Sequence, residues 1–143
     1  VIDVNSPFIF KKIRREKMLK KTSTYTDYDG VQRTEDFYFN LSKTELSEMQ
    51  LSQEGGLDNL IRKISQEQNI PELLKMFKYI VAKSYGIKSA DGKHFKKSKE
   101  IFDDFESTVA YDELFFEFFS KPETAAAFIK GIIPADLAEQ IDA

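Results

Sequence analysis

The order of apolar and polar positions divides the chain into an extended segment and a longer helical one. Residues 19–41 are rich in Thr, Tyr and Phe, a composition typical of β-strands, and the dipeptide Asp29-Gly30 favours a tight hairpin turn. A two-residue turn at this position would place Thr22 opposite Phe37. A lone hairpin is only marginally stable in water, so its Phe-bearing face needs cover from other elements.

Beyond this hairpin the apolar residues take helical spacing. Ser42 and Glu45 have the spacing of a capping box, so a helix is expected to begin at Lys43 and to end before Gly55-Gly56. The same reasoning predicts further helices, with Gly86 and Gly131 as breaks, over residues 57–69, 71–85, from 99 onward, 111–120, 122–129 and 135–141. The predicted fold class is therefore α+β, an N-terminal β-hairpin followed by a mostly α-helical domain.

The length of 143 residues suits one domain, preceded by a short arm. Residues 1–17 form a basic N-terminal arm, and residues 18–143 form the single domain, with the hairpin over 18–41 and the helices over 42–143. Codons for residues 14–17 can consist of purines only, like a bacterial ribosome-binding site ahead of a start codon at Met18. We therefore expect residues 1–17 to be non-native upstream sequence, with a genuine flexible arm as the alternative. The intact mass of the natively expressed product distinguishes the two.

Composition restricts the chemistry that the chain can perform. Thirteen Phe, six Tyr and no Trp indicate either a heavily packed core or an adhesive surface. The absence of cysteine excludes disulfides and thiolate chemistry. No apolar run approaches the roughly 20 residues of a membrane span, so no membrane association is expected.

Charge is distributed unevenly along the chain, whose net charge is −3. Residues 1–22 carry seven basic and two acidic side chains, a net charge of +5, whereas residues 100–143 carry two basic and eleven acidic ones, a net charge of −9. The acidic part disfavours a nucleic-acid-binding surface, and short basic runs are usually solvated, so nucleic acid is not an expected partner. A small regulatory protein that binds nucleic acid through the basic end is a third hypothesis, and deletion of residues 1–17 would abolish such binding.

Two motifs resemble ligand-binding loops but lack essential features. Asp27, Asp29 and Gly30 imitate part of a calcium-binding EF-hand loop, but Tyr25 occupies its first position and strand-like residues flank it, so a hairpin turn is the preferred interpretation. The segment from Gly86 to His94 has one residue too many for a phosphate-binding loop and no hydroxyl after its lysine, so that interpretation is rejected.

No catalytic arrangement is recognisable in the sequence. His94 is the only histidine, and no cluster of His, Cys and acidic residues has ligand spacing. Carboxylate pairs such as Asp103/Asp104 and Glu113/Glu117 fall on acidic helix faces, where solvation is the ordinary explanation. We therefore expect a protein that is not an enzyme and that has no catalytic residues, no metal and no cofactor.

The segment YDELFFEFFS, residues 111–120, is apolar over more of its circumference than a surface helix needs. It lies either at the centre of the core or partly against a partner, and the two alternatives stay open for each residue. An aromatic helix face with acidic surroundings suits an amphipathic helix that has basic flanks. The predicted partner-binding residues are Phe37, Phe39, Phe115, Phe116, Phe118 and Phe119.

Several segments together resemble a known family. They are MLKKT at 18–22, YTDYDG at 25–30, EDFYFNLSKTEL at 35–46, SYGIKSADGKHFKKS at 84–98, TVAYDELF at 108–115 and FIKGIIP at 128–134. This pattern is similar to that of the tail assembly chaperones of long-tailed, siphovirus-type phages of Gram-positive bacteria. The resemblance covers residues 18–137 and leaves residues 1–17 outside.

The resemblance implies a non-enzymatic protein of the host cell cytoplasm that is absent from the mature virion. Such chaperones bind the tape measure protein, keep it soluble and help recruit tail-tube protein. A programmed frameshift in the family often gives a longer second product, and this chain looks like the short one. Whether the chain forms a homo-oligomer stays open. The alternative function is a structural virion component, such as a head–tail connector or a tail-tube-associated protein, which mass spectrometry of purified particles would detect.

Overall fold

The computed structural model describes residues 18–52, 55–66 and 68–133. Within them lies a four-stranded antiparallel sheet in the order β1-β2-β3-β4. Strands β1 (Leu19–Thr26) and β2 (Gln32–Phe39) form the expected hairpin, and β3 (Tyr85–Lys88) and β4 (Phe95–Lys96) continue the sheet beyond β2. The predicted α+β class is confirmed.

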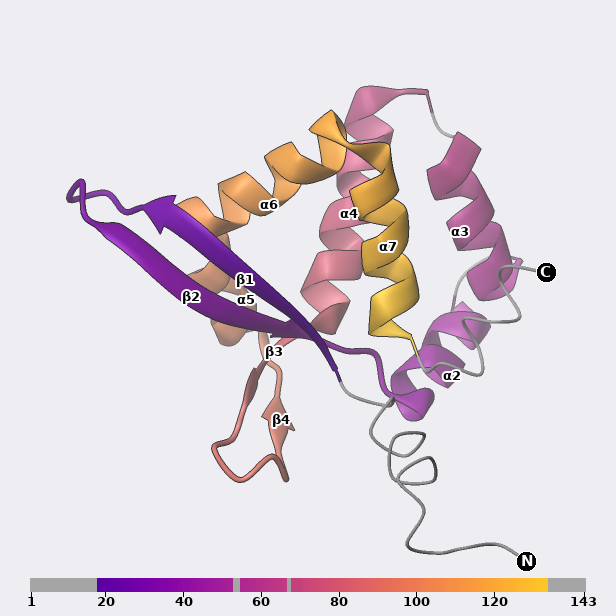
Figure 1. Cartoon of the computed structure of the whole chain (residues 1–143). Coiled ribbons are helices and arrows are strands. Elements are labelled where there is room, and N and C mark those ends of the chain that lie inside the picture. The colour runs from indigo at the N-terminus through magenta and orange to yellow at the C-terminus, as the bar shows by residue number, and fades with distance from the viewer. Residues whose placement is uncertain (1–17, 53–54, 67, 134–143) are drawn as a thin grey trace, which may run out of the picture.

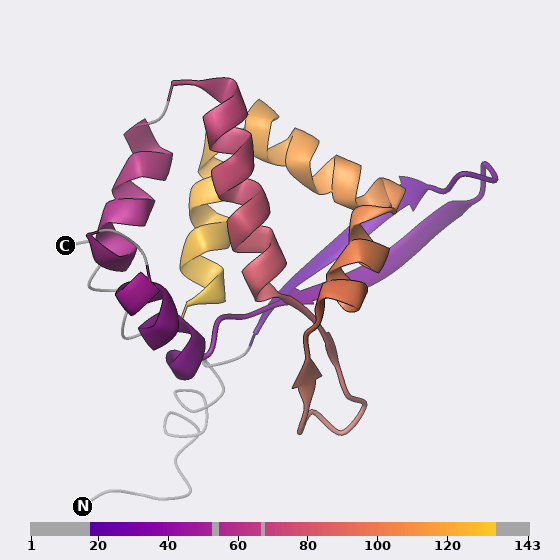
Figure 2. The ribbon, with the colours of Figure 1, turned by 180° about the vertical axis from the view of Figure 1, so that it is seen from behind.

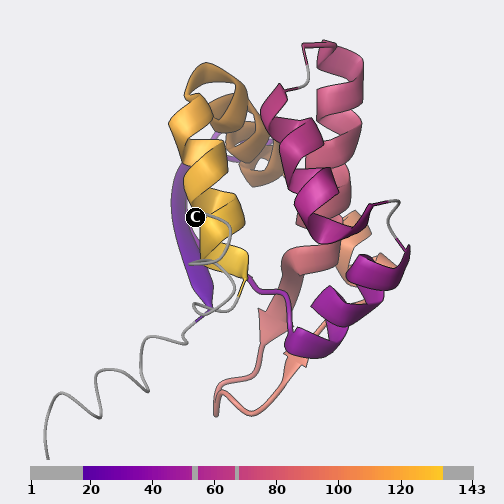
Figure 3. The same cartoon turned by 90° about the vertical axis from the view of Figure 1, so that its right-hand side faces the viewer.

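The helices fall into two groups around the second pair of strands. Helices α2 (Lys43–Ser52), α3 (Gly56–Gln66) and α4 (Ile70–Ser84) precede β3. Helices α5 (Lys99–Glu106), α6 (Val109–Ser120) and α7 (Pro122–Ile132) follow β4. All of them lie on one side of the β1–β2 hairpin (Figure 3), and the tip of this hairpin extends well beyond them (Figures 1 and 2).

The turn of the first hairpin differs from the expected one by one residue. Thr22 lies opposite Asp36 and not the residue after it. The turn consists of residues 28–30, because the Asp27 carboxylate accepts hydrogen bonds of 2.9 Å from the backbone N–H groups of residues 29 and 31. Gly30 has a φ angle of 81°, which a three-residue turn requires of its last residue.

Helix starts occur where the capping residues predict them. The Ser42 hydroxyl accepts from the N–H of Glu45 at 3.1 Å, and the Glu45 carboxylate accepts from the N–H of Ser42 at 3.0 Å. At α5 the Ser98 hydroxyl accepts from the N–H of Ile101 at 3.1 Å. These bonds satisfy N–H groups that have no partner within the helix, which explains why α2 and α5 begin at these positions.

The segment after α4 is a second hairpin, whereas the sequence predicts a polar loop between two helices. The chain becomes extended at Tyr85, and Gly86 lies opposite Tyr38 in the sheet. A Cβ atom at Gly86 would lie 2.8 Å from the Lys96 carbonyl oxygen and 2.9 Å from the Phe95 ring, so glycine permits the close approach of β4. Gly86 therefore supports strand pairing and does not simply end a helix.

The expected break at Gly131 is wrong, because α7 continues to Ile132. Two other expectations, the arm over residues 1–17 and the helix over 135–141, lie outside the described residues.

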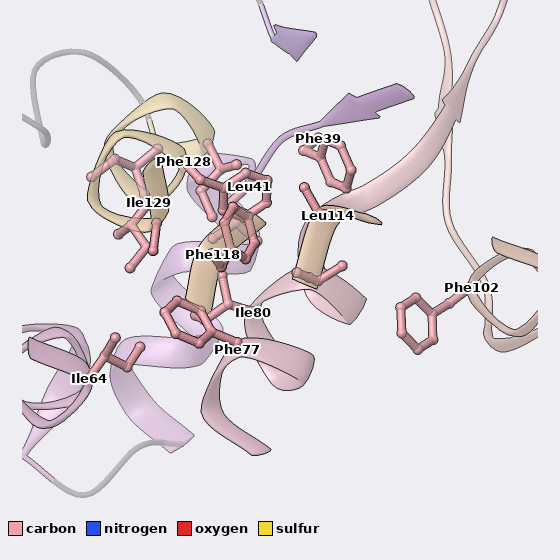
Figure 4. Packing of buried hydrophobic residues seen from close by; sticks show 14 of the residues in the cluster. Phe39, Leu41, Ile64, Phe77, Ile80, Phe102, Leu114, Phe118, Phe128 and Ile129 are labelled. Carbon is pink, nitrogen blue, oxygen red and sulfur yellow. The ribbon is translucent and has the colours of Figure 1, made fainter. Parts of the chain in front are cut away.

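The core is built largely from aromatic rings around Phe39, which is fully buried. Its ring centroid lies 5.1 Å from that of Phe128 on α7 and 6.0 Å from that of Phe105 on α5. Phe118 on α6 lies 5.0 Å from Phe128 and continues the cluster toward α4 (Figure 4). Aromatic rings in such tilted and edge-to-face arrangements stabilise a core beyond the area that they bury.

Lys97 joins three elements at the base of the sheet. Its ammonium group donates to the Glu45 carboxylate at 2.7 Å, and to the carbonyl oxygens of Asn40 at 2.6 Å and Lys83 at 2.8 Å. These contacts connect the end of β2, the start of α2 and the last turn of α4 with the segment that leads into α5. Burial lowers the pKa of Lys97, because the charged form is partly removed from water.

Candidate functional site: the aromatic face of α6

The six phenylalanines of the predicted partner surface do not lie together in the structure. Phe39 has none of its surface exposed and Phe118 only 2%. Both rings pack against Phe128, so in this fold the two side chains serve the core. Partner contact by these two residues would require the core to open.

Phe37 is half-buried on the helix-facing side of the sheet, where its ring centroid lies 5.1 Å from that of Phe105. It lines a small hollow between β1, β2, α5 and α6, next to an ion pair of 3.1 Å between Lys21 and Glu117. The hollow has a volume of about 40 Å³, which is room for no more than a few water molecules. It is too small for an organic ligand.

The remaining three phenylalanines form a surface, which we call the aromatic face of α6 and define as Phe115, Phe116 and Phe119. Phe116 is 72% exposed, while Phe115 and Phe119 are half-buried beside it. The Phe115 ring lies 4.6 Å from that of Tyr111, and the Phe119 ring lies 6.2 Å from that of Phe77. The half-buried rings are therefore held in place by the core, and Phe116 projects from the support that they provide.

Acidic side chains flank the exposed ring. Asp112 and Glu113 precede Phe116 by four and three residues, so all three lie next to one another on the helix surface. Both acids are exposed, and the ion pairs between described residues include neither of them. The predicted set of site residues lacks these two acids, although their helical spacing from Phe116 is visible in the sequence.

The wider surroundings of this face are also acidic. Residues 99–120, which span α5 and α6, carry seven acidic side chains and one basic one, a net charge of −6. A single exposed Phe is ordinary, but neighbouring Phe side chains within an acidic field are typical of a binding surface. The arrangement favours an apolar partner with cationic flanks.

The motifs that resemble ligand sites have structural roles here. The Asp27 carboxylate accepts from the Arg33 side chain at 2.6 Å and from the turn, and the bond from Arg33 is the main cause of its lowered pKa. His94 is exposed, and its N–H donates to the Ser89 hydroxyl at 3.0 Å. In the described part of the chain, no group of three or more His, Cys, Asp or Glu side chains could hold a metal ion.

The membrane question has a simple structural answer. None of the helices between residues 18 and 133 that the structure describes combines the length and the apolarity needed to cross a bilayer.

An α+β fold that exposes an aromatic, acid-flanked helix face is the architecture of a protein-binding module. Comparison with protein families makes this specific, because a family model described as phage tail assembly chaperone matches residues 18–143. The chain belongs to the phage tail assembly chaperone family, which is not a class of enzymes. No curated protein and no solved structure matches the chain. The resemblance to tail assembly chaperones is confirmed, and a Gram-positive host stays a prediction.

Proposed function

We propose that this chain binds the tape measure protein of its phage, keeps it soluble and helps to recruit tail-tube subunits during tail assembly. Membership of the tail assembly chaperone family supports the general role. The observation that carries the proposed mode of binding is the exposure of Phe116 between Asp112 and Glu113. A tape measure protein presents long amphipathic helices, whose apolar seams would otherwise aggregate.

The chemistry of the aromatic face fits such a helix. Burial of a Phe side chain contributes about 2 kcal/mol, and the half-buried rings of Phe115 and Phe119 enlarge the apolar area around it. Asp112 and Glu113 would then meet basic residues at the edges of the apolar seam. Charge pairs of this kind orient a helix more than they add affinity.

Co-expression of this chain with the tape measure protein tests the proposal. We expect Phe116→Asp to place a third carboxylate at the centre of the face and to shift the tape measure protein into the insoluble fraction. The matched control is Leu51→Asp, because Leu51 on α2 is 89% exposed and should be equally tolerant of the change. Circular dichroism checks that both variants fold. If the tape measure protein remains soluble with Phe116→Asp, the aromatic face of α6 is not the binding surface.

We further propose that the protein acts in the host cell cytoplasm and is left out of the finished virion. Family membership supports this placement, since an assembly chaperone leaves the structure that it helps to build. Mass spectrometry of purified particles should then find the tube and tape measure proteins without this chain. Peptides of this chain at a fixed ratio to tube protein would instead favour a structural virion component.

A further inference from the structure

The β3–β4 hairpin carries a charge opposite to that of the aromatic face of α6. Residues 85–98 contain four lysines and one aspartate, a net charge of +3 in a chain whose total is −3. Lys93 and Lys96 are exposed, and the ion pairs between described residues include neither. The hairpin projects from the body on the side away from α6 (Figures 1 and 2).

The hairpin also exposes an apolar side chain next to this charge. Ile87 is 53% exposed and lies opposite Lys96 in the strand pair. Residues directly opposite in an antiparallel pair project from the same face of the sheet. One face of the hairpin therefore presents an apolar group beside a cation, and α6 presents an apolar ring beside two carboxylates.

We propose that the β3–β4 hairpin of one molecule docks on the aromatic face of α6 of a second copy of this chain. Ile87 then lies against Phe116, and Lys96 faces Asp112 and Glu113. The two surfaces lie on opposite sides of one molecule (Figure 1), so they cannot meet within a single chain. The contact is head-to-tail, and such contacts continue from copy to copy until a ring closes or a filament forms.

This docking deepens the proposed function and rests on it, because it uses the same face of α6. Self-association covers Phe116 while no tape measure protein is present, and a longer amphipathic helix with more apolar contacts displaces the hairpin. The contact is small and relies on exposed charges. It is therefore weak and sensitive to salt.

Sedimentation velocity of the full chain, without tape measure protein, tests the docking. At about 0.05 M salt we expect the average mass to rise with concentration above the monomer mass of 16.5 kDa, and at about 0.5 M salt to return to it. The variants Lys93→Glu/Lys96→Glu and Asp112→Lys/Glu113→Lys should each remain monomeric. A mixture of the two variants should associate again, because each reversed surface then meets its complement.

The control for net charge is Lys63→Glu/Lys75→Glu, which makes the same charge change at exposed positions on α3 and α4. It should associate like the unmodified chain. A chain that is monomeric at low salt and high concentration, or association that survives Lys93→Glu/Lys96→Glu, would overturn the docking. Neither result affects the Phe116→Asp experiment, since the hairpin variant should still solubilise the tape measure protein if the proposed function is correct.

Discussion

Lys97 and Glu45 form the most buried ion pair among the described residues, with 19% and 31% of their side chains exposed. Burial alone would raise the pKa of Glu45, but the hydrogen bonds from Lys97 and from the N–H of Ser42 outweigh it, so the pKa lies below its ordinary value. Lys97 gains less, because burial lowers the pKa of its ammonium group despite the pairing with Glu45. The pair therefore depends on both partners being present, and removal of either should be costly.

We expect Lys97→Met to lower the free energy of unfolding by about 2 kcal/mol, because it leaves the Glu45 carboxylate and two carbonyl oxygens without their donor. Urea unfolding followed by circular dichroism measures the change. Lys99→Met is the matched control, since Lys99 pairs with Asp103 at the exposed surface and should have no measurable effect. Equal stability of the two variants would show that Lys97 is not a structural link.

The lowered pKa of Glu45 predicts a pH dependence of stability. Because the folded value lies below the unfolded one, near 4.5, the ionised carboxylate stabilises the fold fully above that pH, and the contribution is lost as pH falls through the folded value. Glu45→Gln keeps an acceptor for Ser42 but does not titrate. The stability difference between the unmodified chain and Glu45→Gln should therefore be larger at about pH 6 than at about pH 3. A difference that is the same at both pH values would contradict this assignment.

At the scale of the elements, the β3–β4 hairpin depends on Gly86. We expect Gly86→Ala to destabilise the chain by about 2 kcal/mol, because the added Cβ would contact the Lys96 carbonyl and the Phe95 ring at under 3 Å. Hydrogen exchange provides a local readout, since the bond from the Ser89 N–H to the His94 carbonyl, 2.8 Å long, should lose protection first. Lys93→Ala in the same hairpin is the control. Unchanged protection in Gly86→Ala would mean that β4 can move aside at no cost.

The elements that sequence predicts well are those with a local physical cause. The start of α2 follows from Ser42 and Glu45, and the start of α5 follows from Ser98, because a cap acts within one turn of its own residue. The first hairpin also follows from local chemistry, but its register depends on whether the Asp27 side chain closes a two-residue or a three-residue turn. That choice shifts every cross-strand pair by one residue.

The second hairpin and the surface of α6 could not be predicted in the same way. Strands β3 and β4 contain four and two residues, which is too few for an alternating pattern, and they exist because β2 offers a free edge. Helix α6 has apolar residues on most of its circumference, so sequence cannot tell Phe118, which lies in the core, from Phe116, which lies outside. Only the positions of α4, α7 and the sheet decide between them.

At the scale of the whole molecule, the sheet and the helices each depend on the other. The β1–β2 hairpin has helices on only one side (Figure 3), and its inner face is completed by Phe105 from α5 and Phe128 from α7. The overall class and the family follow from residues spread along the chain, whereas the opposed charges of the β3–β4 hairpin and α6 become a spatial feature only after folding. The charge-reversal experiment belongs to this scale because it tests two distant surfaces together.

The contact between the first hairpin and the last described helix also sets an order of events during synthesis. The N–H of Leu41 donates to the carbonyl of Ile132 at 2.7 Å, and the ring of Phe39 rests on that of Phe128. A ribosome makes the hairpin early and α7 late, so a nascent chain that lacks α7 leaves Phe39 only partly covered. Contacts over such sequence separations close slowly. The chaperone therefore completes its own core only after nearly all of the described chain has been translated.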